Sequence, residues 1–297
     1  MGSGFKPYSE ALRQASMDAA LRMLMGDGVS SETAPRTACA PDCRGYHTGW
    51  LALQSLQIIS GLSYEREEMV RNLRRRHAER PISSLMIAGA ADFGMLSVVH
   101  EALGSDITTA PVTILDRCLT PLLLCELYAQ RMGFAVEVVQ ADLVNWPKPR
   151  QFDVILGHSI LSFIVPEQRG VFIASLTSHL APEGRLVLYQ SIRPTLGNGP
   201  LNFGQDETQQ WIAAAGAAWE AAGERFSWLP KDLLVDVVAE FCRVKQTHAV
   251  GSIAELAAIF RDAGLKPEFR KLFDSSTQHK AATPNSVYEK YVIYGSR

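Results

Sequence analysis

Apolar positions recur at helical spacing through the first 80 residues of the chain. The first such segment covers Leu12–Met25 and ends at Gly26 and Gly28, because glycine interrupts a helical pattern. After a polar loop with two prolines, the spacing returns at Trp50–Ile59 and in the charged segment Tyr64–Ala78. No convincing strand interrupts this region. Residues 1–80 therefore predict a helical cap.

After Pro81 the pattern changes to short, wholly apolar runs, which are typical of strands buried on both faces of a sheet. Five runs are predicted as strands: Leu85–Ala88, Val112–Leu115, Val136–Val139, Val154–Gly157 and Leu186–Tyr189. Helices are predicted between them over Met95–Leu103, over Pro121–Met132 with Thr120 as the N-cap, and from about Pro166 to Leu180. This alternation favours βαβ units and a doubly wound, mostly parallel sheet.

The last 50 residues have a different order of elements. Ser252 and Glu255 form a capping box, and the helix that they begin ends at Gly264. Lys266–Phe273 and Val287–Tyr294 then follow as strands with only a loop between them, which predicts an antiparallel hairpin. The expected fold is an α/β domain over residues 81–297 with a seven-stranded sheet, and a helical insertion at about 193–250.

Small residues follow the first predicted strand. In open α/β sheets, ligands bind outside the carboxyl ends of the strands. Gly89 and Ala91 are small enough to let the backbone approach a ligand there, and Gly94 allows close packing of helix and strand. A tight turn without any ligand is the alternative for such a motif.

Polar residues follow the next three strands. Asp116 lies 22 positions after Gly94 (116 − 94), near the spacing at which an acid accepts hydrogen bonds from ribose hydroxyls. A loop aspartate that caps the next helix is the alternative. Asp142 can accept from an exocyclic adenine amine while Leu143 packs on the ring, and His158 places an imidazole at the centre of the edge.

Together these segments resemble the class I S-adenosylmethionine-dependent methyltransferase family, over about residues 80–190 and 250–297. Gly89 and Ala91 match the family's Gly-rich first motif, Asp116 its ribose acid and Asp142 its adenine-edge acid. Leu180–Leu188 resembles the family's turn into its fifth strand. The resemblance implies S-adenosylmethionine as the cofactor and methyl transfer as the activity.

Two positions depart from the family pattern. The family carries an acid two positions before the first glycine, where Ile87 stands here. Phe93 stands at a third glycine position, and we expect it to displace the turn, with Gly94 compensating. Without the acid, the cofactor's amino group is expected to be held by the backbone at Gly89 or by the cap.

The cap offers a cluster of candidate ligand contacts at Tyr46, His47 and Trp50. Tyr46 is assigned to the cofactor, and His47 and Trp50 to the substrate. Arg117 is expected to meet the cofactor's carboxylate or ribose, with an ordinary solvated arginine as the alternative.

Methyl transfer from a sulfonium requires positioning, a desolvated site and, for hydroxyl or ammonium acceptors, a general base. His158 and His47 are the candidate bases. Tyr189 and Arg193, near the end of the fifth strand, are candidate substrate contacts. If Arg193 points into the cleft, it favours an acceptor with a carboxylate or phosphate.

The helical segments of the cap and the insertion favour an enclosed small molecule, amino-acid-like or a secondary metabolite, as the methyl acceptor. The net charge is −2, and Lys and Arg are scattered apart from a cluster at Arg71–Arg80, whose helical spacing spreads it around an exposed segment. No nucleic-acid partner is therefore expected. No metal is expected either, because Cys39 and Cys43, even with His47, lack a fourth ligand.

The sequence predicts a cytoplasmic protein. No apolar stretch approaches the roughly 18 residues of a membrane span, the start lacks the apolar region of a signal peptide, and five cysteines, an odd number, favour reduced thiols.

Three alternatives remain beside a small-molecule methyltransferase. An NAD(P)-dependent oxidoreductase uses a similar Gly-rich turn and ribose acid. A protein that binds S-adenosylmethionine without catalysis is the second. A role of the Leu- and Met-rich cap in homodimer formation is the third, and it is compatible with catalysis.

Overall fold

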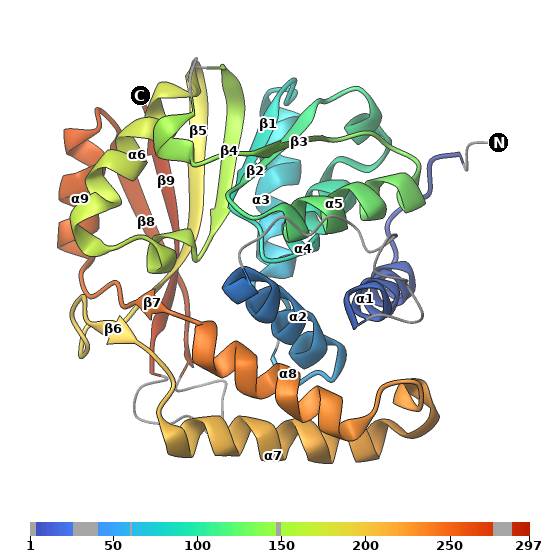
Figure 1. The fold of residues 1–297 in the computed structure, drawn as a ribbon. Helices are drawn as coiled ribbons and strands as arrows, with labels where there is room; N and C mark the ends of the chain where they lie inside the picture. Colours follow the sequence, from blue (N-terminus) through green and yellow to red (C-terminus); the bar gives the residue numbers. More distant parts are fainter. Residues whose placement is uncertain (1–3, 26–40, 60, 147–149, 276–286) are drawn as a thin grey trace.

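A mostly parallel sheet of seven strands forms the centre of the molecule (Figure 1). The computed structural model describes residues 4–25, 41–59, 61–146, 150–275 and 287–297, without the side chains of 41–44. The strand order is β3-β2-β1-β4-β5-β9-β8. These strands are β1 (Leu85–Ala88), β2 (Val112–Asp116), β3 (Glu137–Gln140), β4 (Phe152–His158), β5 (Leu180–Ile192), β8 (Lys266–Asp274) and β9 (Glu289–Ser296).

The first five strands pair in parallel, whereas β9 pairs antiparallel with both β5 and β8. The predicted fold class, a doubly wound sheet with a terminal antiparallel hairpin, is confirmed. The hairpin places the last strand of the chain inside the sheet, between β5 and β8.

Helices cover both faces of the sheet, because β1, β2, β4 and the second half of β5 are buried on both sides. Side chains such as Ile87 pack with α3 (Arg66–Glu79), α4 (Gly94–Leu103) and α5 (Leu119–Met132) on one face. Met86 and its neighbours pack with α6 (Arg169–Ser178) and α9 (Ile253–Asp262) on the other. The alternation of adjacent residues between the two faces follows from the pleat of a strand.

Four helices lie clear of the sheet, below the carboxyl ends of its strands in Figure 1. They are α1 (Glu10–Met25) and α2 (Pro41–Ser55) from the predicted cap, and α7 (Gln205–Ala222) and α8 (Lys231–Val244) from the predicted insertion, which also contributes the short strands β6 (Pro200–Leu201) and β7 (Thr247–His248). Helices α2 and α8 approach closely, since a Cβ at Gly49 would lie 2.3 Å from the Cβ of Phe241. The third helix of the predicted cap, α3, instead packs on the sheet.

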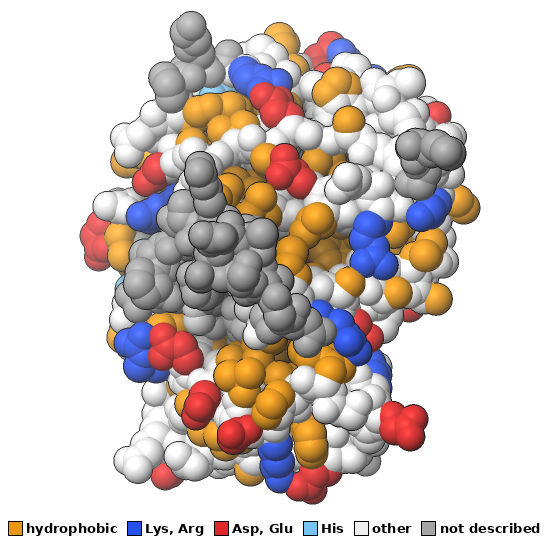
Figure 2. Space-filling view, turned by 45° about the vertical axis from the view of Figure 1, so that its right-hand side comes forward, with side chains coloured by type: hydrophobic (Ala, Val, Ile, Leu, Met, Phe, Trp, Pro, Cys, Tyr) orange, Lys and Arg blue, Asp and Glu red, His pale blue; other side chains and the backbone are white. Residues whose placement is uncertain are grey.

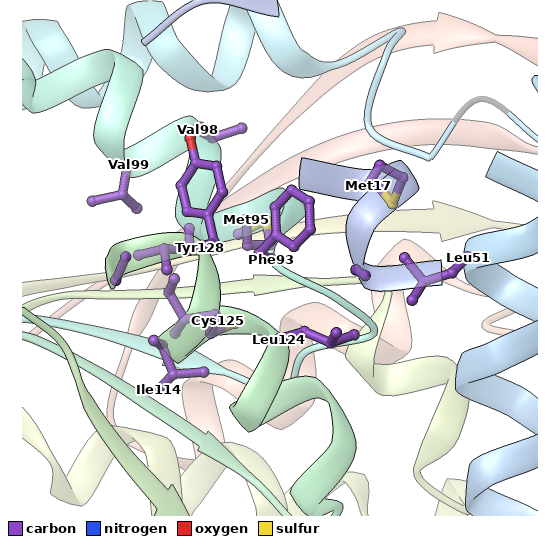
Figure 3. Close-up of a cluster of buried hydrophobic side chains, with 14 of the residues drawn as sticks. Met17, Leu51, Phe93, Met95, Val98, Val99, Ile114, Leu124, Cys125 and Tyr128 are labelled. Atoms are coloured by element: carbon purple, nitrogen blue, oxygen red, sulfur yellow. The ribbon is translucent and has the colours of Figure 1, made fainter. Parts of the chain in front are cut away.

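Phe93 occupies the core rather than the ligand edge. Its ring is 1% exposed and stacks on Tyr128 with 4.7 Å between the ring centroids (Figure 3). The same cluster reaches Met17 of α1 and Leu51 of α2, so apolar residues of the cap are buried within this chain. Phe93 is therefore accommodated by packing between α4 and α5, and the cap's Leu and Met residues at these positions are not a dimer surface.

Two predicted boundaries are wrong. Thr120 does not cap α5: the helix begins at Leu119 after Cys118, and Thr120 is buried within its first turn. Helix α2 begins at Pro41, inside the predicted polar loop, because proline is favourable in the first turn of a helix.

The expectation that all cysteines are reduced thiols is wrong at Cys118. Cys125 and Cys242 are free and buried, as expected, but Cys118 is disulfide-bonded. The side chains of Cys39 and Cys43, weighed as metal ligands, lie outside the described residues. Among the helices of the described ranges, none combines the length and apolar character needed to cross a membrane.

Candidate active site

The turn after β1 presents its backbone at the carboxyl edge of the sheet. Gly89 has a φ of +78°, a conformation that side-chain-bearing residues rarely adopt. Its N–H donates to the carbonyl of Leu115 at 2.8 Å, which ties the turn to β2. A Cβ at this position would lie 2.4 Å from the Cδ1 of Ile160. The positive φ therefore favours glycine here, and any Cβ would also have to displace the end of the Ile160 side chain.

Asp116 joins the ends of β1 and β2. One carboxylate oxygen, Oδ2, accepts from the N–H of Ala90 at 2.8 Å, and Oδ1 accepts from the N–H of Cys118 at 2.7 Å. Burial raises the pKa of this carboxyl to about 6, against the backbone hydrogen bonds that favour its ionised form. Each carboxylate oxygen carries two lone pairs, so accepting capacity remains for a ligand's hydroxyl groups.

Arg117 and Asp142 lie together on the β2–β3 side of the edge. Arg117 is exposed, and its Nε lies 3.9 Å from Oδ2 of Asp142. Asp142 Oδ1 accepts from the N–H of Val144 at 3.0 Å, which caps the short turn Leu143–Asn145. Leu143 is buried beside α6 and presents little side chain to the edge. The structure thus brings together both polar candidates, whereas Leu143 belongs to the core.

Helix α2 is fastened to the Gly89 turn by hydrogen bonds. His47 Nδ1 donates to the carbonyl of Ala91 at 2.8 Å, and the indole N–H of Trp50 donates to Asp92 Oδ2 at 2.8 Å. The amide of Gln54 and the N–H of Gly94 also bond to Asp92. Burial lowers the pKa of His47 to about 4, so this ring is neutral at neutral pH.

Asp92 was not singled out in the sequence, although it lies within the first motif. Its position in the sequence could have indicated it, because Asp92 is an acid that follows two alanines and comes just before the start of α4. Its carboxylate accepts hydrogen bonds from groups of α2 and α4, so Asp92 holds helix α2 against the Gly89 turn.

Aromatic rings form a wall next to this turn. Tyr46 stacks on Trp50 and on Phe241 of α8, at centroid distances of 6.2 and 5.5 Å, and meets Phe163 edge-on at 5.6 Å. Phe203, near β6, continues the wall at 6.0 Å from Phe241. The predicted cap residues and the insertion therefore share one apolar surface.

His158 lies in a buried cluster of charged groups that sequence reasoning missed. Lys290 Nζ, on β9, lies 3.0 Å from His158 Nε2 and 2.9 Å from Glu65 Oε1, and it also donates to Ser159 Oγ at 3.2 Å. Lys290 is 2% exposed and Glu65 is 4% exposed. Ser159 has a φ of +52°, so the backbone beside this cluster is also held in a sparsely populated conformation.

The charges of the cluster are set by mutual contact. Burial acts to raise the pKa of Glu65, but Lys290 and His158 outweigh it and hold that pKa well below its ordinary value. Burial and then the ammonium of Lys290 lower the pKa of His158. A neutral His158 accepts from Lys290 through Nε2, which occupies the lone pair that a general base needs at that nitrogen.

Of the two residues assigned near the end of β5, Tyr189 is not brought to the edge. Its side chain is 1% exposed, and its hydroxyl accepts from Asn72 of α3 at 3.0 Å. The pleat turns Tyr189 toward the α3 face of the sheet, so its assignment as a substrate contact is wrong in this structure. Arg193, four residues on, is partly buried with its guanidinium over the ring of Tyr288, 4.9 Å from the centroid.

On the face drawn in Figure 2, Lys and Arg side chains alternate with Asp and Glu rather than forming a continuous basic surface. Among the described residues, no group of three or more His, Cys, Asp or Glu side chains is arranged to hold a metal ion.

No protein-family model matches the chain, and neither does any curated protein. Three similar solved structures are methyltransferases with S-adenosylhomocysteine bound. One is 1,6-didemethyltoxoflavin-N1-methyltransferase from Burkholderia thailandensis, with 16% identity, a TM-score of 0.47, and coverage of 87% of this chain and 91% of that one. Magnesium protoporphyrin IX methyltransferase from Synechocystis has 14% identity, a TM-score of 0.47, and coverage of 97% and 96%. Geranyl diphosphate C-methyltransferase from Streptomyces coelicolor has 13% identity, a TM-score of 0.48, and coverage of 100% and 91%.

Proposed function

We propose that the protein binds S-adenosylmethionine and transfers its methyl group to an O, N or S atom of a small molecule. One observation carries the proposal: in a sheet that ends in an antiparallel hairpin, the buried carboxylate of Asp116 is held against the backbone of the Gly89 turn. A vicinal diol donates two hydrogen bonds, which suits a carboxylate with lone pairs to spare. The glycine turn leaves room for a ligand to approach the backbone.

The other predicted site residues are proposed to bind the cofactor and the acceptor around the carboxylate of Asp116. Arg117 and Asp142 supply a cation and an acceptor on the adenine side, and Tyr46 supplies an apolar wall on the cap side. S-adenosylmethionine supplies an activated methyl group, so the protein's own residues mainly orient the acceptor and exclude water. His47, neutral because of its low pKa, keeps a lone pair at Nε2 once Nδ1–H donates to Ala91. We propose His47 as the better candidate of the two predicted bases, although it is the more buried ring, since His158 Nε2 already accepts from Lys290.

The cap and the insertion are proposed to enclose the acceptor. Helices α2 and α8 pack together below the strand ends, where an acceptor would have to lie (Figure 1). Such a covered site suits a small molecule better than a polymer.

An NAD(P)-dependent oxidoreductase is the less favoured candidate. Dinucleotide-binding sheets of the order 3-2-1-4-5-6 carry a sixth parallel strand beyond the fifth. Here the antiparallel β9 takes that position.

Calorimetric titration of the purified protein tests the assignment. We expect micromolar binding of S-adenosylmethionine and S-adenosylhomocysteine and no heat with NADH or NADPH. Binding of a nicotinamide cofactor alone would contradict the proposal. Binding of S-adenosylmethionine without turnover on any small acceptor would identify a non-catalytic binding protein instead.

Affinity for S-adenosylhomocysteine should fall as the pH drops below 6. The pKa of Asp116 is raised to about 6 in the folded protein, so the free protein takes up a proton there below that pH. The ribose hydroxyls donate to the ionised form, and the protonated form must lose its proton before binding. We expect the dissociation constant to rise about tenfold per pH unit below 6. Calorimetry at pH 7.5, 6.0 and 5.0 measures this, and Asp116→Asn should remove the dependence.

The raised pKa of Asp116 affects the stability of the free protein in the opposite direction, so that lower pH stabilises the free protein while it weakens ligand binding. A carboxyl with a raised pKa in the folded state is destabilising when ionised. The penalty is absent below about pH 4, the ordinary range of an aspartate. It develops as the pH rises and is complete above about pH 6, where the folded protein ionises.

A further inference from the structure

A hollow lies between helix α3 and the sheet, on the face that also carries α4 and α5. Its floor consists of alternate residues of β4 and β5, because every second side chain of a strand points to the same face: Val154, Leu156, Arg185, Val187 and Tyr189. Arg185 pairs with Val154 near the start of β4. This end of the hollow therefore lies away from the carboxyl ends of the strands, where the candidate active site is.

Helix α3 covers the hollow with one of its faces. Its lining residues recur at the spacings of three and four that mark a single face of a helix: Met69, Asn72, Leu73, Arg76 and Glu79. Arg75 lines the hollow beside them, with its Nε 3.9 Å from Oε1 of Glu79, and both of these side chains are exposed. Together with Arg185 on β5, the lining holds three guanidinium groups and one carboxylate. It therefore carries an excess of positive charge.

Arg76 is the buried member of the arginine-rich segment Arg71–Arg80, which was expected from the sequence to be exposed. It is 9% exposed, and its Nη1 donates to the carbonyl of Arg80 at 2.8 Å. Its Nε is also buried, and it has no acceptor among the residues that the structure describes. A buried donor without an acceptor is unfavourable, and native proteins rarely contain one. The hollow thus presents an N–H group that lacks a partner.

Like charges surround the guanidinium of Arg76. Burial, and then the positive charges of Arg185 and Arg80, lower the pKa of Arg76. Asp153 and Glu79 act in the opposite direction and have the smaller effect. Arg185 is exposed, and within the described ranges its side chain forms no ion pair or hydrogen bond. An anion in the hollow would supply the missing acceptor and reduce the repulsion.

We propose that the hollow under α3 is an anion-binding site in which Arg75, Arg76 and Arg185 bind one phosphate group. Arginine presents a planar fork of N–H donors that matches the oxygens of a phosphate. A phosphate monoester carries about two negative charges near neutral pH, which balances three guanidinium groups and one carboxylate. The site lies apart from the proposed methyl-transfer site, and the proposal does not depend on the proposed function.

Calorimetric titration of the full chain with inorganic phosphate and with glycerol 3-phosphate tests the proposal, in a chloride buffer of constant ionic strength. We expect saturable binding of at least one of the two, with one site per chain. Tighter binding of the ester would identify a phosphorylated small molecule as the source of the group. Equal or tighter binding of inorganic phosphate would identify the free ion. Saturation with S-adenosylhomocysteine should leave the affinity for phosphate unchanged.

Arg185→Gln should weaken phosphate binding about tenfold to a hundredfold, the range for a hydrogen bond to a charged group. Because Arg185 is exposed and forms no ion pair in the described ranges, this variant should fold normally. Arg71→Gln is the matched control. It removes the same charge one turn before Arg75, at a side chain that is 62% exposed, against 60% for Arg75, and that pairs with acids of α3 outside the hollow. The control should bind phosphate as the unmodified protein does.

Four results would overturn the proposal. They are a lack of saturable binding of either phosphate compound, unchanged affinity in Arg185→Gln, an equal loss of affinity in Arg71→Gln, and displacement of phosphate by S-adenosylhomocysteine. A failure of S-adenosylhomocysteine to bind would count against the proposed function alone, because the comparison of Arg185→Gln with Arg71→Gln needs no cofactor.

Discussion

Asp116→Ala is expected to weaken S-adenosylhomocysteine binding by at least a hundredfold. The substitution removes the acceptor for the N–H groups of Ala90 and Cys118, which hold the β1 and β2 turns together. It also removes the acceptor proposed for the ribose hydroxyls. Hydrogen bonds to a charged group contribute about 1.5–3 kcal/mol each, so the loss of two from the ligand corresponds to about 10²–10⁴ in affinity. Calorimetry with the purified variant measures the change.

Asp116→Asn separates the two contributions. The amide keeps the shape and one oxygen acceptor, but its NH2 group meets a backbone N–H and cannot accept. We expect an intermediate loss of affinity. Asp106→Asn, at an exposed aspartate near His77, is the control and should bind normally. If Asp116→Ala bound the ligand within fivefold of the unmodified protein, Asp116 would not be the ribose acid.

Lys290→Met is expected to lower the free energy of unfolding by about 3–5 kcal/mol, because it leaves the charge of Glu65 buried without its main partner. The pKa of Glu65 should rise, since the ammonium that holds it down is removed. The pKa of His158 should rise as well, because a nearby cation is lost and the carboxylate remains. Urea denaturation measures the first effect, and NMR titrations of the Glu65 carboxyl and the His158 ring measure the other two.

The stability of a double variant shows whether Lys290→Met destabilises the protein by breaking an ion pair or by removing a packed side chain. Glu65→Gln combined with Lys290→Met removes both charges, so it should be more stable than Lys290→Met alone. Lys266→Met, at an exposed position of β8, should change stability by less than about 0.5 kcal/mol. A double variant as unstable as the sum of its single variants would show that the two charges do not interact.

The elements that could be predicted from sequence are those with a strong local signal. Strand β1 matches its prediction from Leu85 to Ala88, because a short, wholly apolar run after Pro81 is typical of a strand buried on both faces. The N-cap half of the capping box is also confirmed, with Ser252 Oγ accepting from the N–H of Glu255, whereas the Glu255 carboxylate accepts from the amide of Asn198. Helix α2 could not be predicted in full, since its first four residues read as part of the polar loop, and its described part is held by the bond from His47 to the Gly89 turn and by close approach to α8.

Only one part of the candidate site could be predicted from sequence, namely the residues that follow parallel strands, because the carboxyl ends of those strands meet at one edge of the sheet. That rule places Gly89, Asp116 and His158 on the same side of the sheet, as the structure has them. It says nothing of Lys290, which is 225 positions from Glu65 in sequence (290 − 65) and reaches it only through the position of β9. The rule also does not predict to which face of the sheet a given side chain points, which is why Tyr189 was assigned to the wrong face.

The interior position of β9 makes completion of the sheet a late event in the synthesis of this protein. Residues 289–296 are translated after the other strands of the described ranges, yet they supply the pairing partner of both β5 and β8, and Lys290 as well. A nascent chain still held by the ribosome at this segment has an open gap in its sheet and no cation beside His158. The first motif and Asp116 are by then already made, so the proposed cofactor side of the site forms before the charged cluster at His158. The sheet and the His158 cluster are thus completed only after residues 289–296 have left the ribosome.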